Sequence, residues 1–102
     1  MRGKDRAALR AEAHHLRATV HVGHQGVTDA VLRSLEEALA ARELVKVQVE
    51  RAAPGTVKST AGSLSAAVGA EVVQVIGRKA TLYRHNPALE RSRDGTPPWR
   101  AA

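Results

Sequence analysis

The sequence predicts a single compact α/β domain in which three helices pack on a mixed four-stranded sheet. Two observations lead to this fold class. Segments with helical periodicity alternate with short β-branched segments, and the last two β-rich segments are joined by a tight turn. The chain has 102 residues, which is enough for one modest core and too few for two. The expected element order is therefore α-β-α-β-α-β-β.

The three helices are expected over residues 4–17, from Thr28 to about residues 41–43, and over about residues 56–68. Each segment carries apolar residues three and four positions apart, which is the spacing of one buried helix face. Thr28 is a favourable N-cap, and Asp29 follows it where the helix dipole favours an anion. Gly69 is a residue type that commonly ends a helix, so the third helix is expected to stop there.

The four strands are expected over residues 18–22, 44–50, 71–76 and 80–84. In the second of them, valines alternate with Lys46, Gln48 and Glu50, a pattern that predicts a strand with one buried face. The last two strands are separated only by residues 77–79, so they are expected to form an antiparallel hairpin. Because the other strands alternate with helices, the sheet should be mixed.

The composition excludes several classes of function. There is no cysteine, which rules out disulfides, thiolate metal sites and cysteine nucleophiles. One Tyr, one Trp and no Phe are too few rings for the domain types that stack several bases on aromatic platforms. No apolar run approaches the ~18–20 residues that a membrane span needs. We therefore expect a soluble cytoplasmic protein with no membrane partner.

The positive charge is concentrated at the two ends of the sequence. The formal net charge is +6, made of +3 in residues 1–28, −1 in residues 29–77 and +4 in residues 78–102. Such a distribution is typical of proteins that bind polyanions, although basic surfaces also occur without that role. Charge alone therefore makes nucleic acid a candidate partner and does not decide the question.

The stretch VGHQGVT places two glycines, Gly23 and Gly26, directly before the second helix, with His24 and Gln25 between them. One interpretation is a tight turn with no ligand. The other is a phosphate site, because glycines let a ligand approach the backbone closely and a helix N-terminus presents free N–H groups. The four residues by themselves are compatible with both.

Two longer segments, LRATVHVGHQGVTDAVLRSLEEALAARELVKVQV and AEVVQVIGRKATLYR, closely resemble the YhbY-like or CRM (chloroplast RNA splicing and ribosome maturation) domain over about residues 5–84. The glycine loop entering a helix, the RELVKV strand start and the VVQVIGRKATLYR hairpin occur in the family's order. The resemblance implies a fold akin to the C-terminal domain of translation initiation factor three. Stand-alone bacterial members associate with precursors of the large ribosomal subunit, and members in plant organelles assist intron splicing.

The resemblance implies a non-enzymatic protein that binds RNA, most plausibly large-subunit rRNA during ribosome assembly. The family has a GxxG element in the loop after its first strand, which corresponds here to Gly23, His24, Gln25 and Gly26. Members often have a basic or small polar residue inside the loop and a proline before the first strand, where this chain has His24-Gln25 and Ala18. Because His24 is mostly neutral at pH 7, the attraction for phosphate must come from other cations. The candidates are Arg6, Arg10, Arg17, Lys46, Arg78 and Lys79.

Other classes of function and ligand are weighed against RNA binding. The chain could be a protein-interaction module that docks on a ribosomal protein or assembly factor. A ribosome-associated enzyme would need a reactive side chain that the sequence does not display, and no cofactor or small-molecule substrate is expected. His14, His15, His21 and His24 make a poor metal site, because the first two diverge on a helix and no nearby carboxylate completes the set. We expect a monomer.

The domain is expected to span residues 1–84, followed by a flexible basic tail over residues 85–102. The tail is polar, interrupted by prolines and without periodicity. Tyr83 is expected to be half buried. Trp99, in the tail, could stack on a base or lie in solvent, and solvent is the favoured placement.

Overall fold

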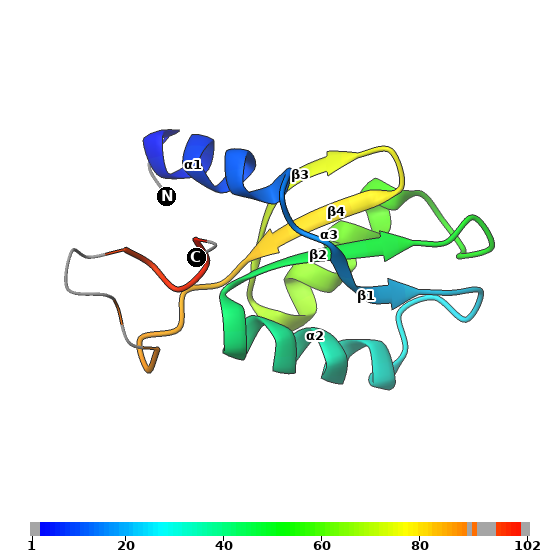
Figure 1. Cartoon of the computed structure of the whole chain (residues 1–102). Coiled ribbons are helices and arrows are strands. Elements are labelled where there is room, and N and C mark those ends of the chain that lie inside the picture. The colour runs from blue at the N-terminus through cyan, green and yellow to red at the C-terminus, as the bar shows by residue number, and fades with distance from the viewer. Residues whose placement is uncertain (1–2, 90, 92–95, 101–102) are drawn as a thin grey trace.

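The computed structural model describes residues 3–89, 91 and 96–100, and within them it shows the seven expected elements in the expected order (Figure 1). The elements are α1 (Gly3–Ala13), β1 (Ala18–Val22), α2 (Asp29–Arg42), β2 (Leu44–Val49), α3 (Val57–Val68), β3 (Glu71–Ile76) and β4 (Lys79–Tyr83). None of the helices in these residues is long and apolar enough to cross a membrane. The seven elements and their order confirm the predicted fold class.

The four strands form one mixed sheet in the order β1-β2-β4-β3. β1 and β2 are parallel and are connected through α2, as parallel strands require a crossover. β4 lies antiparallel between β2 and β3, so the predicted hairpin of the last two strands is confirmed. This order places the ends of β1, β2 and β3 at the same side of the molecule as the glycine loop (Figure 1).

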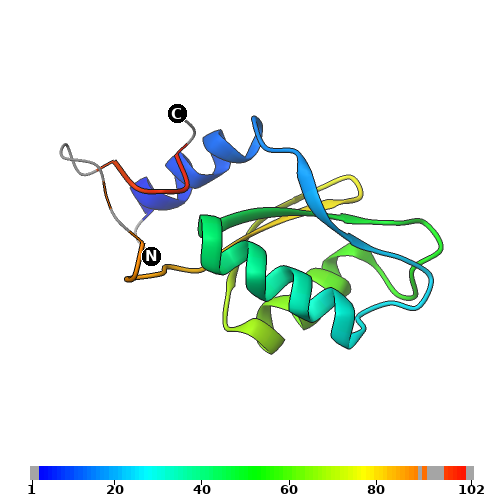
Figure 2. The same cartoon turned by 60° about the horizontal axis from the view of Figure 1, so that its bottom comes forward.

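The main core lies between the sheet and two of the helices, α2 and α3 (Figures 1 and 2). Val45, Val47 and Val49 of β2 point into this core and are almost completely buried, as the alternation in the sequence predicts. Leu35 and Leu39 of α2 pack against them, together with leucines and small residues of α3 and β4. Aliphatic side chains alone therefore build the main core.

The opposite side of the sheet is only partly covered. α1 packs over one end of it, where Leu9, Leu44 and Val73 form a second, smaller buried cluster. The rest of this side, which we call the open sheet face, carries mostly polar side chains. Its residues are Thr19 and His21 of β1, Lys46 and Gln48 of β2, Lys79 and Thr81 of β4, and Gln74 and Ile76 of β3.

The helix ends follow local hydrogen bonding. Thr28 caps α2 by accepting from the Val31 N–H at 3.2 Å, and Gly69 ends α3 in the left-handed conformation, so both predictions are confirmed. The first helix is shorter than predicted and ends at Ala13 instead of residue 17. A tight turn follows it, in which the Leu16 N–H donates to the carbonyl of Ala13 at 3.2 Å. This turn lets Leu16 pack on the smaller cluster and lets β1 begin at residue 18.

Glu43, between α2 and β2, is the residue that ties the C-terminal segment to the domain. Its side chain is fully buried, and its φ of 67° is unusual for a residue that carries a side chain. The carboxylate accepts from the backbone N–H of Asn86 at 2.7 Å and from both terminal nitrogens of Arg91 at 3.2 and 3.3 Å. Its carbonyl accepts from the N–H of Arg84 at 2.9 Å. Nothing in the sequence indicated this role for Glu43.

Trp99 does not lie free in solvent, contrary to the expectation. It is half buried and packs with Leu16 and Tyr83 on the smaller cluster beneath α1. The reason is that this cluster has an apolar edge that α1 alone leaves uncovered, and the indole covers part of it. Flexibility of residues 85–102 as a whole stays a prediction, and residues 90, 92–95 and 101–102 lie outside the described residues.

Candidate nucleic-acid interface

The glycine loop leaves the carboxyl end of β1 and forms a closed turn. The Gly26 N–H donates to the carbonyl of Gly23 at 2.9 Å, and Gly26 has a φ of 72°, in the left-handed region that favours glycine. A Cβ atom at Gly26 would lie 3.1 Å from Cγ of Pro54, in the loop between β2 and α3. The turn itself and its contact with Pro54 therefore explain Gly26 without any ligand.

Gly23 is different, because the chain does not require a glycine there. A Cβ atom at Gly23 would meet no other atom within 4 Å, and its backbone is outside the left-handed region. The side chains of His24 and Gln25 next to it are exposed. With Thr28 and Val31, the loop lines a shallow hollow of about 150 Å³. At Gly23 the backbone is thus open to a close approach from outside.

The N-terminus of α2 adds little net positive charge to this loop. Thr28 already satisfies one of its free N–H groups, and the exposed Asp29 places a carboxylate in the first turn. The carboxylate offsets part of the positive end of the helix dipole. The loop can therefore supply backbone donors to a phosphate, and most of the attraction must come from cations elsewhere.

The two glycines should respond differently to alanine. Gly26→Ala is expected to lower the free energy of unfolding by about 1–2 kcal/mol, because a side chain disfavours the left-handed conformation and this one also presses on Pro54. Gly23→Ala should leave stability unchanged or raise it by up to about 1 kcal/mol, through the lower entropy of the unfolded chain. Urea denaturation of both variants measures the difference, and equal stabilities would contradict this account of the loop.

Lys46 and Lys79 form a pair of like charges on the open sheet face. Lys46 lies opposite Thr81 and Lys79 opposite Gln48 in the β2–β4 register, which makes the two lysines diagonal neighbours. Burial, and then the charge of Lys79, lower the pKa of Lys46 below its usual value. Among the described residues neither lysine has a carboxylate within ion-pair distance. Two lysines thus neighbour each other on this face without a carboxylate at ion-pair distance among the described residues.

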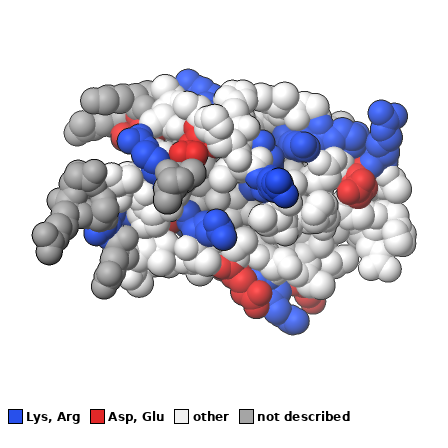
Figure 3. Space-filling view, viewed as in Figure 1, with Lys and Arg blue, Asp and Glu red and all other residues white. Residues whose placement is uncertain are grey.

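Two hollows meet at Lys46. The first, about 110 Å³, is lined by Lys46 and Lys79 together with polar side chains and Ile76. The second, about 350 Å³, is lined by Arg17, Arg42 and Lys46, together with Thr19 and His15. The arrangement brings Arg17, Lys46 and Lys79 of the predicted set to one side of the sheet, with Arg42 as an addition. Figure 3 shows Lys and Arg side chains gathered across the middle of this side, with little acidic surface between them.

Two of the other predicted cations have partners within the chain. Arg6 donates to the carbonyl of Val72 at 3.3 Å and pairs with Glu71 at 3.4 Å. Arg78 donates from Nε to the carbonyl of Val49 at 2.8 Å and from Nη2 to that of Glu50 at 2.7 Å. Both side chains therefore help to hold the fold, and their part in RNA binding stays a prediction.

Two further exposed cations, Arg10 and Arg51, lie on α1 and in the loop next to the glycine loop. Arg10 is exposed on α1 and has no partner among the described residues at ion-pair distance. Arg51 is exposed in the β2–α3 loop, whose Pro54 contacts Gly26. The sequence reading missed Arg42 and Arg51. Arg42 belongs to the last turn of α2 and lines the same hollow as Arg17 and Lys46, and Arg51 lies in the loop that also contains Pro54.

The histidines and acidic side chains do not form a metal centre in the part of the chain that the structure describes. No three His, Asp or Glu side chains there are close enough to hold a metal ion. Instead, Nδ1 of His21 lies 3.8 Å from Oε1 of Glu50, and Nδ1 of His85 lies 3.2 Å from Oε2 of Glu43.

Comparison with known proteins identifies the family. The sequence profile of the CRS1/YhbY (CRM) domain matches residues 1–84. "Probable RNA-binding protein YqeI" of Bacillus subtilis is 37% identical over 84 residues, which are 82% of this chain and 88% of the relative. "Probable RNA-binding protein PA4753" of Pseudomonas aeruginosa is 38% identical over 74 residues, with 72% and 71% covered.

A solved structure shows the same fold. The solution structure of the hypothetical protein SAV1595 from Staphylococcus aureus has a TM-score of 0.73 and 29% sequence identity, and the match covers 96% of this chain and 99% of that one. The structural match agrees with the fold described above. The chain belongs to the CRS1/YhbY (CRM) domain family.

Proposed function

We propose that the protein binds structured RNA through its phosphate backbone, using the open sheet face and the glycine loop. The observation that carries this proposal is the pair of neighbouring lysines, the partly buried Lys46 and the exposed Lys79, without a carboxylate at ion-pair distance among the described residues. A bound phosphate would place a negative charge between two neighbouring cations and so reduce their mutual repulsion. The names of the relatives as RNA-binding proteins support the same ligand class.

The glycine loop has a complementary part in the proposal. Gly23 lets a phosphate oxygen reach the backbone, and the turn fixed by Gly26 keeps that site in place. Phosphate contacts of this kind position the protein on RNA and carry no sequence information, so recognition by the domain rests on the shape of the RNA. The resemblance to stand-alone bacterial members makes precursors of the large ribosomal subunit the proposed RNA partner.

Affinity for a large-subunit rRNA fragment, measured across a salt series, tests the proposal. With about four phosphates contacted, affinity should fall roughly 100-fold between 50 and 200 mM salt. Gly23→Asp should weaken binding about tenfold and make the salt dependence shallower by about one contact, because it places a carboxylate where the phosphate would lie.

Gly62→Asp is the matched control. It introduces the same charge on the exposed side of α3, and a Cβ atom there also meets nothing within 4 Å. This variant should bind like the wild type apart from the small effect of net charge. If Gly23→Asp binds as well as Gly62→Asp, the loop is only a turn and the role proposed for it is wrong.

Docking on a protein is the second candidate function, and one observation favours it. Val75 and Ile76 of the edge strand β3 are 37% and 56% exposed, which is high for large aliphatic side chains. Tight binding to a ribosomal protein or assembly factor in the absence of RNA, and with little dependence on salt, would support this function over the first.

A further inference from the structure

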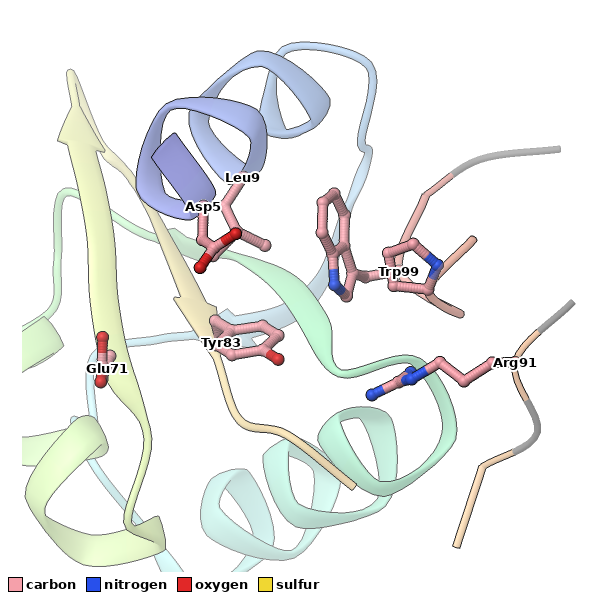
Figure 4. A pocket seen from close by; sticks show the side chains of 7 residues that line it. Asp5, Leu9, Glu71, Tyr83, Arg91 and Trp99 are labelled. Carbon is pink, nitrogen blue, oxygen red and sulfur yellow. The ribbon is translucent and has the colours of Figure 1, made fainter. Parts of the chain in front are cut away.

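A cavity lies beneath α1, at the end of the sheet away from the glycine loop. It has a volume of about 470 Å³ and is lined by Asp5 and Leu9 of α1, Glu71 of β3, Tyr83 of β4, and Arg91, Pro97 and Trp99 of the C-terminal segment (Figure 4). This volume is within the range of sites that hold a small ligand. Three of its lining residues lie beyond residue 84, outside the part that matches the family.

Both aromatic side chains of the chain line this one cavity. The sequence contains a single Tyr and a single Trp and no Phe, and Tyr83 and Trp99 are these two residues. Trp99 rests on the smaller apolar cluster, and the guanidinium of Arg100 lies 5.3 Å from the centre of its ring. A planar ligand that enters the cavity therefore has aromatic surface to stack on.

The polar groups of the cavity have opposite charge at opposite sides. Figure 4 shows Asp5 and Arg91 approaching it from different directions, with the Tyr83 ring between them. Glu71 is paired with Arg6, whereas Asp5 has no ion-pair partner among the described residues. Arg91 is held by Glu43 and His85, and these contacts use only part of its five N–H donors.

Tyr83 contributes a hydrogen-bond donor. Burial, and then the nearby Glu43 carboxylate, raise the pKa of the Tyr83 hydroxyl above its usual value. The hydroxyl therefore stays protonated at neutral pH. The cavity thus combines a stacking surface, an acceptor-only carboxylate, a hydroxyl and a cation.

The cavity is in line with the lysine pair. Lys79, Thr81 and Tyr83 are alternate residues of β4 and so point to the same side of the sheet. From Lys79 to Tyr83 the strand spans about 13 Å, at ~3.3 Å per residue. Thr81, between them, is almost completely buried, and α1 contacts both β2 and β3 on either side of β4. An RNA that places phosphates at the lysines must therefore pass around α1 to place a base in the cavity.

We propose that this cavity accepts one unpaired guanine of the bound RNA, stacked on Trp99, with the Asp5 carboxylate accepting from the base and Arg91 facing its phosphate. Guanine fits because its Watson–Crick edge presents two adjacent N–H donors, which match the two oxygens of a carboxylate. Adenine and uracil do not present two adjacent donors there. The inference rests on the proposed RNA binding and adds a base preference to it, which the sheet and the glycine loop do not supply.

Fluorescence of Trp99, the single tryptophan, reports on this site directly. The full chain would be titrated with the RNA pentamers UUGUU, UUAUU and UUCUU. Stacking should quench Trp99, and UUGUU should bind about tenfold more tightly than UUAUU, as one well-matched base contact provides. Asp5→Asn should abolish this preference while quenching by stacking remains. Glu37→Gln, which removes a carboxylate from the exposed side of α2, should leave the preference intact.

The failure of this inference can be distinguished from failure of the proposed function. If the three pentamers quench Trp99 equally, or none quenches it, while the rRNA fragment still binds with steep salt dependence, the guanine site is wrong and RNA binding stands. A preference for guanine that survives Asp5→Asn also contradicts the assignment. If the rRNA fragment does not bind, the proposed function itself fails.

Discussion

Lys46→Gln combined with Lys79→Gln is expected to weaken RNA binding by about 10- to 100-fold at moderate salt, and to make the salt dependence shallower by about two contacts. The reason is that these two lysines are neighbouring cations of the open sheet face, and neither has a carboxylate at ion-pair distance among the described residues. A bound phosphate would supply the missing negative charge. Arg33→Gln on the exposed side of α2 is the control for loss of a charge and should have little effect.

The same substitution should not destabilise the fold, which separates loss of binding from unfolding. Because the pKa of Lys46 is lowered in the folded state, the unfolded chain binds more protons between that pKa and 10.5. Stability of the wild type should therefore rise with pH in this window, and Lys46→Gln should remove that rise. The double variant should be at least as stable as the wild type near neutral pH. A variant that unfolds, or that keeps full RNA affinity, would contradict the role assigned to the pair.

Glu43→Gln is expected to lower the free energy of unfolding by about 1–3 kcal/mol. The carboxylate is fully buried and accepts from Asn86 and from both terminal nitrogens of Arg91, so a neutral amide cannot satisfy all of these donors. The residues after β4 should also loosen from the domain, and the fluorescence of Trp99 should shift toward that of an exposed indole.

Glu37→Gln is the matched control for this substitution, because Glu37 is an exposed glutamate of the preceding helix α2 without an ion pair in the described structure. Its stability should remain within about 0.5 kcal/mol of the wild type. Denaturant unfolding followed by circular dichroism and by fluorescence measures both effects. Equal stability of the two variants would show that Glu43 does not anchor the C-terminal segment.

Local signals in the sequence were sufficient for most of the fold. The N-cap at Thr28, the αL glycine at position 69 and the alternation from Val45 to Val49 each act over a few residues, and the structure has all three as expected. The position at which the first helix ends depends instead on contacts between residues that are distant in the sequence. Leu16 turns away to complete a cluster with residues of β2 and β3, and tertiary packing of this kind is not visible in helical periodicity.

The candidate site was less predictable because it depends on register and on long-range contacts. Charge identified Lys46 and Lys79 singly, but only the β2–β4 pairing makes them neighbours. The same charge criterion selected Arg78, whose guanidinium is held by backbone carbonyls of β2 and of the residue after it. It gave no reason to select Arg42, which lines the same hollow as Lys46. In the sequence, a cation that binds a ligand cannot be told from one that stabilises the fold, because the contacts of its side chain within the chain are not visible there.

The most direct test of the central claim is to map the contact surface by NMR, with ¹⁵N-labelled protein and the large-subunit rRNA fragment. If the protein grips RNA as proposed, amide shifts should be largest in residues 23–28 and along the open sheet face of β2 and β4. The outer sides of α2 and α3 should change little. Shifts concentrated on those helices would contradict the account and place the contact with RNA elsewhere.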